Sequence, residues 1–153
     1  MGKISTDALG SVFTDALIEV IAKTSGFSLE VLSAEQNAGF DENTAIMKLC
    51  GNNSVMVFIS AEEASMRILC SYIEGIPQNE ITQEDINDVL SELVNMTAGS
   101  AKLLLNDTDY MFTLSSPFLI SGKDMSITTK KRVTVISRTI GNEEIKIRLK
   151  IIL

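Results

Sequence analysis

The sequence has no histidine and no tryptophan, and only two cysteines and two prolines among its 153 residues. Without histidine, the chain cannot build a Ser-His-Asp triad, a histidine-ligated haem site or the common catalytic zinc sites. Cys50 and Cys70 form no CxxC pair and no four-ligand set. We interpret both as small buried apolar residues of a reduced protein, and no neighbouring motif supports a thiol nucleophile.

Familiar catalytic motifs and long apolar runs are absent as well. The sequence has no glycine-rich phosphate loop, no GxSxG and no HExxH. The acidic stretch 106-NDTD-109 lacks the glycine and the distal glutamate of a calcium loop, so it indicates an ordinary turn. No apolar run approaches the roughly 18 residues of a membrane span, and the N-terminus lacks a secretory signal pattern. We expect a cytoplasmic protein that binds no membrane.

The chain is acidic, with a formal net charge of −7. This charge argues against nucleic acid as a partner. Residues 1–122 hold five Lys/Arg against 17 Asp/Glu, whereas residues 123–153 hold eight against three. Lys146, Arg148 and Lys150 alternate with apolar residues, which predicts a half-buried strand with a charged solvent face. A basic docking surface for an acidic partner is the alternative.

Length and apolar content fit one domain with a substantial core, and we expect a single domain over residues 1–153. The apolar periodicity predicts three helices, over residues 5–24, 60–72 and 83–105. It predicts strands near residues 27–33, 44–50, 54–60, 110–121, 125–138 and 143–153. Because strands and helices do not alternate strictly, we expect an α+β fold with an antiparallel or mixed sheet and helices packed on one side.

Capping and turn residues mark the ends of these elements. Gly26 should stop the first helix, and Thr82 should cap the third. Ser60 with Glu63 suggests a capping box at the start of the second helix, which should end near Gly75. The segments 51-GNN-53 and 141-GN-142 should connect neighbouring strands as hairpin turns.

The predicted helix over residues 83–105 carries the most informative pattern. At ~100° per residue, its apolar stripe comprises Ile86, Val89, Leu90, Leu93 and Leu104. Its opposite stripe comprises Asp88, Ser91, Glu92, Asn95 and Gly99. Glu92 and Asn95 therefore lie side by side, about 4.5 Å apart along the helix axis on a rigid support.

An outward glutamate and asparagine at this spacing are most often an ordinary solvated helix face. Asparagine is a poor helix former, however, because its amide competes with the backbone for hydrogen bonds. Asn95 is short and carries both a donor and an acceptor, which suits it to positioning a water molecule.

The segment 88-DVLSELVN-95, with Pro117 following in 115-SSPFLISG-122, resembles the Asp/Ser-xxx-Glu-xx-Asn…Pro signature of the chemotaxis phosphatases CheC and CheX. It is more similar to the CheX branch, because only one copy of the signature is intact. The resemblance implies the CheC-like fold, a two-layer α+β domain. It also implies that the chain removes the phosphoryl group from the aspartate of a CheY-like response regulator.

In this family the helix docks on the phosphorylated regulator. The resemblance implies that Glu92 pairs with a regulator lysine and that Asn95 orients the attacking water. Further partner contacts are expected from Asp88, Ser91, Glu92, Gly99 and Pro117. The regulator would supply the bound Mg²⁺, so no cofactor or metal of the chain's own is expected.

CheX-type dimers also suggest a homodimer, in which the long C-terminal strand pair could extend its sheet across a two-fold axis. The alternative is a non-catalytic dimeric scaffold module of the same superfamily. A small-molecule site between helices and sheet has no convergent polar cluster in its favour.

The first predicted helix repeats the spacing of the third. Asp15, Glu19, Ala22 and Gly26 match the spacing of the outward stripe, which suggests a duplicated unit with alanine in place of the amide. Ordinary helix periodicity explains the match equally well. Either way, we expect one working site per chain.

Overall fold

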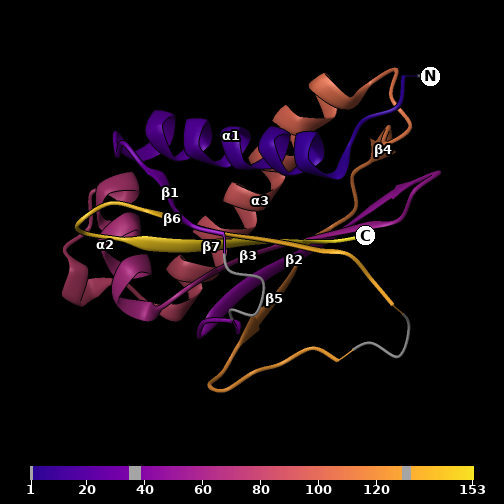
Figure 1. Cartoon of the computed structure of the whole chain (residues 1–153). Coiled ribbons are helices and arrows are strands. Elements are labelled where there is room, and N and C mark those ends of the chain that lie inside the picture. The colour runs from indigo at the N-terminus through magenta and orange to yellow at the C-terminus, as the bar shows by residue number, and fades with distance from the viewer. Residues whose placement is uncertain (1, 35–38, 129–131) are drawn as a thin grey trace.

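The structure is a computed structural model that describes residues 2–34, 39–128 and 132–153. In chain order the elements are α1 (Thr6–Ser25), β1 (Glu30–Ser33), β2 (Asn43–Gly51), β3 (Val55–Ala61), α2 (Glu63–Glu74), the short 3-10 helix η1 (Gln78–Glu80), α3 (Gln83–Leu105), β4 (Phe112–Thr113), β5 (Phe118–Ser121), β6 (Val135–Gly141) and β7 (Lys146–Ile152). Figure 1 shows their arrangement, with α1 lying across one side of the sheet.

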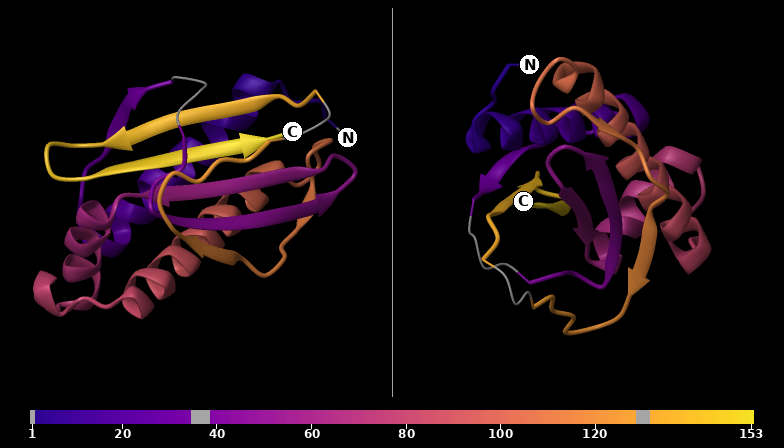
Figure 2. Two further views of the ribbon diagram at one scale, coloured as in Figure 1. Left: turned by 90° about the horizontal axis from the view of Figure 1, so that it is seen from below. Right: turned by 90° about the vertical axis from the view of Figure 1, so that its right-hand side faces the viewer.

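The strands form one sheet in the order β1-β6-β7-β3-β2-β4, and β5 also pairs with β2, at the end of β2 away from β4. All of these pairings are antiparallel. The sheet is strongly curved, with the helices on its outer, convex side and the described chain that follows β5 passing on the other (Figure 2). These observations confirm the α+β fold with helices on one side.

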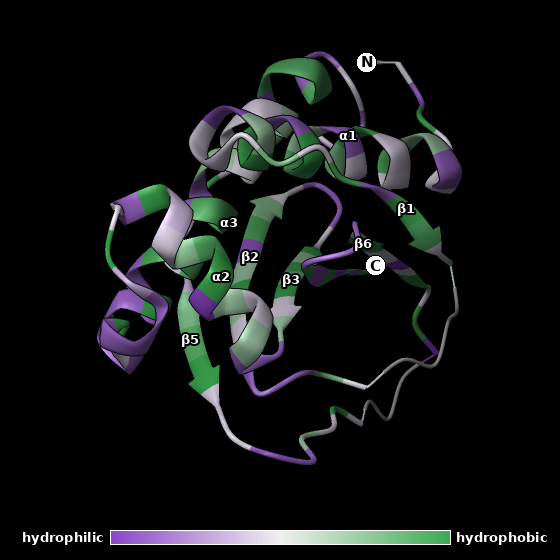
Figure 3. Ribbon diagram, turned by 90° about the vertical axis from the view of Figure 1, so that its left-hand side faces the viewer, coloured by the Kyte–Doolittle hydropathy of each residue, from purple (hydrophilic) through white to green (hydrophobic). Residues whose placement is uncertain are grey.

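The core lies between the helices and the convex face of the sheet. Alternate residues of the central strands point into it, such as Val57 and Ile59 on β3 and Leu149 and Ile151 on β7, all fully buried. Figure 3 shows that the helices also carry both hydrophobic and hydrophilic positions. The period of two along β3 and β7 is the reason that the sequence could predict these strands.

The predicted ends of α1 and α3 are confirmed. Ser5 caps α1 by accepting a hydrogen bond from the backbone N–H of Ala8, and Gly26 ends the helix with a positive φ of 82°. A glycine suits this left-handed conformation because it has no Cβ to clash. Helix α3 spans Gln83–Leu105, as the periodicity predicted. The hairpin turns after Gly51 and Gly141 are also present.

The predicted capping box at the start of α2 is wrong. The N-cap of α2 is Glu62, and its side chain makes no capping hydrogen bond. Ser60 instead belongs to β3, where its hydroxyl accepts a hydrogen bond from the backbone N–H of Asp41 and contacts Thr44. The sheet needs this hydroxyl to fix the chain that enters β2, so it is not available to the helix.

The predicted strands near residues 110–121 and 125–138 are only partly correct. The first is two short strands, β4 and β5, which pair with different parts of β2. The second begins at Val135, and the described residues of 125–134 form no strand. Residues 129–131 of that prediction lie outside the described residues. In the described residues 125–128 and 132–134, polar and charged side chains interrupt the apolar alternation, so no apolar face is available for a strand to bury.

Two further expectations are corrected. Cys70 is buried, and this burial raises the pKa of its thiol to about 12, but Cys50 is exposed near the end of β2. On β7, Lys146 is exposed but Lys150 is buried, with its ammonium 4.5 Å from the centre of the Phe40 ring. The face predicted to be solvated is thus partly covered by the chain that precedes β2.

Candidate functional site

The N-terminal end of α3 is fixed by a reciprocal capping box. The Thr82 hydroxyl accepts from the backbone N–H of Asp85, and the Asp85 carboxylate accepts from the backbone N–H of Thr82 at 2.8 Å. This arrangement satisfies backbone donors that the first helical turn leaves free. The predicted cap is therefore confirmed, and the helix begins at a defined residue.

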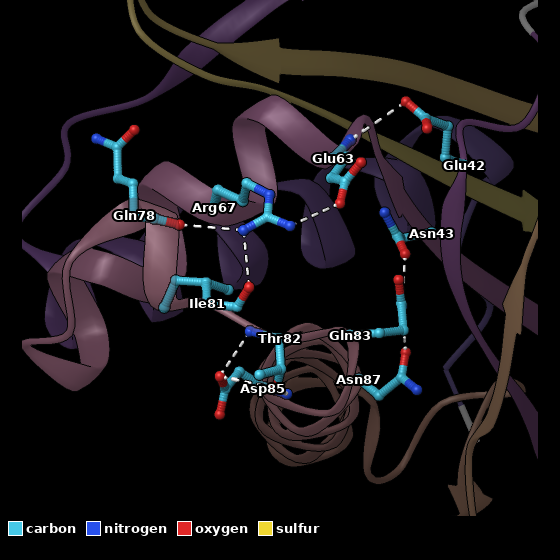
Figure 4. Close-up of polar contacts among 10 residues, drawn as sticks. All are labelled: Glu42, Asn43, Glu63, Arg67, Gln78, Ile81, Thr82, Gln83, Asp85 and Asn87. Carbon is cyan, nitrogen blue, oxygen red and sulfur yellow. Dashed lines mark hydrogen bonds and ion pairs between the residues drawn. The ribbon is translucent and has the colours of Figure 1, made fainter.

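Side chains also attach this end of α3 to its neighbours (Figure 4). The Gln83 amide donates at 2.8 Å to the buried Asn43 of β2 and at 2.9 Å to Asn87. Arg67 of α2 donates to the carbonyl oxygen of Ile81, at 2.7 Å, and pairs with Glu63. These contacts tie α3 to both the sheet and α2, so its outward face has a fixed orientation.

The inward face of α3 packs on α1 and on the sheet, mainly β2. Its buried residues are Ile86, Val89, Leu90, Leu93, Val94, Thr97, Ala98, Ala101 and Leu105. This confirms four of the five predicted inward positions. Leu104 was predicted wrongly, because it is 67% exposed. Its helical angle points toward the core side, but the described part of the chain leaves this side chain largely uncovered at the end of α3.

The outward face carries the predicted site residues. Asp88 and Glu92 are exposed, and Ser91, Asn95 and Gly99 are half-buried on the same helix. Within the described part of the chain, neither the Glu92 carboxylate nor the Asn95 amide has a hydrogen-bond or ion-pair partner. Both groups are therefore available to a molecule that docks on this face.

Gly99 lies one turn beyond Asn95 and leaves the helix surface bare. A Cβ placed on Gly99 would meet no other heavy atom within 4 Å. The position has a helical conformation, so neither packing nor a positive φ requires a glycine there. Glycine inside a helix costs about 1 kcal/mol relative to alanine. The fold by itself gives no reason for this residue.

Pro117 lies outside the helix, in the connection between β4 and β5. Just before it, the Ser115 hydroxyl donates at 2.6 Å to the carbonyl oxygen of Lys48 on β2. Pro117 directly precedes β5, a strand that contacts α3. The structure thus brings five predicted positions together on α3 and places Pro117 on a separate segment, next to a strand that contacts α3.

A hollow of about 160 Å³ adjoins Glu92, where α1, α2 and α3 meet. Its lining is mostly apolar and comprises Thr24, Ile73, Glu74, Asp88, Val89, Glu92, Leu93 and Met96. Burial raises the pKa of the Glu74 carboxyl, and the negative charges of Asp85 and Asp88 add to this effect. Sequence reasoning missed the hollow because its walls come from three helices that share no local motif.

The first helix does not reproduce this surface. Asp15 and Glu19 are exposed on α1, but Glu19 forms an ion pair at 2.7 Å with Lys23. Gly26 ends α1 with a positive φ, whereas Gly99 lies inside α3. The two glycines therefore have different structural roles, and the matching spacing is weak support for a duplicated site.

Two negative findings apply to the described residues alone. In residues 2–34, 39–128 and 132–153, no three His, Cys, Asp or Glu side chains gather where they could hold a metal ion. No helix in those ranges is long and apolar enough to cross a membrane.

Comparison with solved structures shows that this fold is shared. A CheC-like superfamily protein from Shewanella sp. PV-4 matches with a TM-score of 0.84 and 23% identity, over 97% of this chain and 98% of that one. The chemotaxis protein CheX of Vibrio vulnificus matches with a TM-score of 0.82 and 19% identity, over 94% of both chains.

A third similar structure is a complex of CheX with CheY, BeF3 and Mg²⁺ from Borrelia burgdorferi. It matches with a TM-score of 0.77 and 17% identity, over 93% of this chain and 96% of that one. A comparison with curated proteins found no match. The family model described as "Chemotaxis phosphatase CheX" matches residues 43–140, which is more than half of the chain and includes all of α3. The chain therefore belongs to the CheX family of chemotaxis phosphatases.

Proposed function

We propose that this protein is a phosphatase that hydrolyses the aspartyl phosphate of a CheY-like response regulator. The observation that carries the proposal is the outward face of α3, where Glu92 and Asn95 have no partner in the described chain and Gly99 leaves room beside them. A rigid helix that presents a free carboxylate and a free carboxamide is suited to reach into another protein's site. Family membership and the similar CheX–CheY complex support the same partner.

In the proposed reaction, a water oxygen attacks the phosphorus of the phosphoaspartate. The bond between phosphorus and the aspartate oxygen breaks, the aspartate leaves as a carboxylate, and inorganic phosphate takes up the water's oxygen. The regulator supplies the Mg²⁺ and most of the charge stabilisation. Asn95 supplies orientation, because its amide can both donate to and accept from the attacking water. Fixing a water in line can contribute ~10² in rate, or about 2.7 kcal/mol.

Glu92 is proposed to guide docking by pairing with a lysine of the regulator. Reversing its charge in Glu92→Lys should raise the Kd for the phosphorylated regulator and leave the fold intact, because the side chain is exposed. Glu84→Lys, an exposed position on the first turn of the same helix, is the matched control. If titration calorimetry gave equal Kd values for the two variants, Glu92 would have no specific role in the interface.

The proposed assembly is a homodimer formed through a sheet edge. The two edges of β7 are occupied by β6 and β3, so β7 cannot pair with a second copy. Among the described residues, β1 covers only Thr139–Gly141 of β6, which leaves Val135–Arg138 unpaired on that side. Unpaired backbone groups of this kind are ready to bind another strand. Sedimentation at micromolar concentration should give twice the mass of one chain, and a monomer there would contradict the dimer.

The activity itself is tested with phosphorylated response regulators from the source organism. Adding catalytic amounts of the protein should accelerate loss of phosphate from at least one of them. Binding without acceleration would favour a scaffold instead of an enzyme.

A further inference from the structure

We propose that an apolar seam on α3, formed by Met96 and Leu103, packs against the phosphorylated regulator and that Leu103 contributes most of the apolar contact. The proposal rests on the proposed function, since it names a second part of the same docking surface. Glu92 would pair with a charge of the regulator and Asn95 would orient the water, whereas Leu103 would increase the affinity for the regulator.

The seam follows from helical geometry. Met96 and Leu103 are seven positions apart, a spacing that returns to nearly the same helical angle with a drift of ~20° per heptad. Leu103 lies eleven residues after Glu92, which is three turns later and within ~20° of the same direction. It is eight residues from Asn95, or ~12 Å along the axis. One docked molecule of ordinary size therefore covers both.

Exposure increases along the seam. Met96 lines the hollow beside Glu92 and is half-buried. Leu103 is 75% exposed, the largest value among the large apolar side chains of the described residues. The seam thus begins in a depression next to the carboxylate and ends in a protruding leucine at the far end of α3.

The fold does not use Leu103. Of the three consecutive leucines that end α3, only Leu105 is buried. A single exposed leucine is common on protein surfaces and needs no explanation. Here the leucine lies on the same side of α3 as Glu92 and Asn95, whose polar groups have no partner in the described chain. Apolar residues bordered by polar ones are the usual composition of a protein interface. The occupant it fits is the phosphorylated regulator, because Asn95 on the same face must reach the phosphoryl group.

Kinetics of phosphate loss from the phosphorylated regulator test the proposal. Leu103→Ser should raise KM about tenfold and leave kcat unchanged, because the seam binds without touching the reacting atoms. Leu104→Ser is the matched control. Leu104 has the same residue type and nearly the same exposure, 67%, but its direction on the helix differs by ~100°. It should have the wild-type KM.

A wild-type KM for Leu103→Ser, or equal effects of both variants, would overturn the seam while Asn95 could still prove catalytic. If the wild-type protein binds a regulator but does not accelerate phosphate loss, the Kd takes the place of KM. A Leu103-dependent Kd would then support the seam although the proposed activity had failed. If no regulator binds at all, the seam is wrong together with the proposed function.

Discussion

At the scale of single residues, the outward face of α3 combines two poor helix formers. Asn95 and Gly99 both cost helix stability relative to alanine; in the described chain the Asn95 amide has no hydrogen-bond partner, and a Cβ on Gly99 would meet no atom within 4 Å. Functional surfaces commonly carry such locally unfavourable choices. The docking proposed above, with the regulator close over Gly99 and a water held by Asn95, would account for both.

Replacing Gly99 with alanine separates folding from docking. Gly99→Ala should raise the free energy of unfolding by roughly 1 kcal/mol, because the position is helical and the new methyl group meets no neighbour within 4 Å. The same methyl group should raise KM for the regulator by standing between the two surfaces. Urea unfolding and steady-state kinetics measure the two effects. Higher stability with an unchanged KM would show that no partner approaches Gly99.

At the scale of elements, α3 was predictable from the sequence because its signals are local. The Thr82 cap, the apolar period and the following turn all lie within or next to the helix, and its bounds match the prediction. The Ser60 cap failed because a tertiary contact with the chain before β2 claims that hydroxyl. The exposure of Leu104 depends on where neighbouring elements end, which no pattern within α3 contains.

The capping box at the N-terminus of α3 should support stability without taking part in the chemistry. Thr82→Ala removes the capping hydroxyl and should lower the free energy of unfolding by about 1 kcal/mol. Its kcat should stay at the wild-type value, because Asn95 is thirteen residues away, or ~20 Å along the axis. Thr134→Ala, an exposed threonine before β6, is the control for urea unfolding. A large loss of kcat in Thr82→Ala would mean that the capping box also positions the site.

At the scale of the whole molecule, the two faces of the sheet differ in how far the sequence predicted them. The convex face is covered by α1, α2 and α3, and helices on one side were expected (Figure 2). The other face was expected to be a solvated row of basic residues, but Asp41 lies there 3.5 Å from Arg148, and Phe40 lies under Lys150. Non-local packing of this kind cannot be derived from the alternation of one strand.

Asp41 on this face should make the free energy of unfolding depend on pH. Burial raises the pKa of Asp41 above its usual 3.8, and this outweighs the opposing effect of Arg148. The folded state therefore holds this proton more tightly than the unfolded state. The contribution of Asp41 to stability is full below pH 3.8 and falls as the pH rises through the raised pKa.

Asp41→Asn isolates that contribution. The free energy of unfolding of the wild type minus that of Asp41→Asn should decrease as the pH rises above 3.8 and through the raised pKa of Asp41. Urea unfolding at several pH values gives this difference and cancels the titration of the other carboxylates. A difference that increases with pH would mean that the ion pair with Arg148 dominates instead.

The central claim is that Asn95 carries the chemistry of the docked helix. Its most direct test is the single-turnover rate of phosphate loss from the phosphorylated regulator at saturating protein, for the wild type, Asn95→Ala and the exposed control Asn79→Ala. Saturation removes differences in affinity, so the rate reports the chemical step. We predict a loss of ~10² in rate for Asn95→Ala with a melting temperature at or slightly above that of the wild type, because alanine is the better helix former, and wild-type behaviour for Asn79→Ala. A wild-type rate in Asn95→Ala would contradict the account.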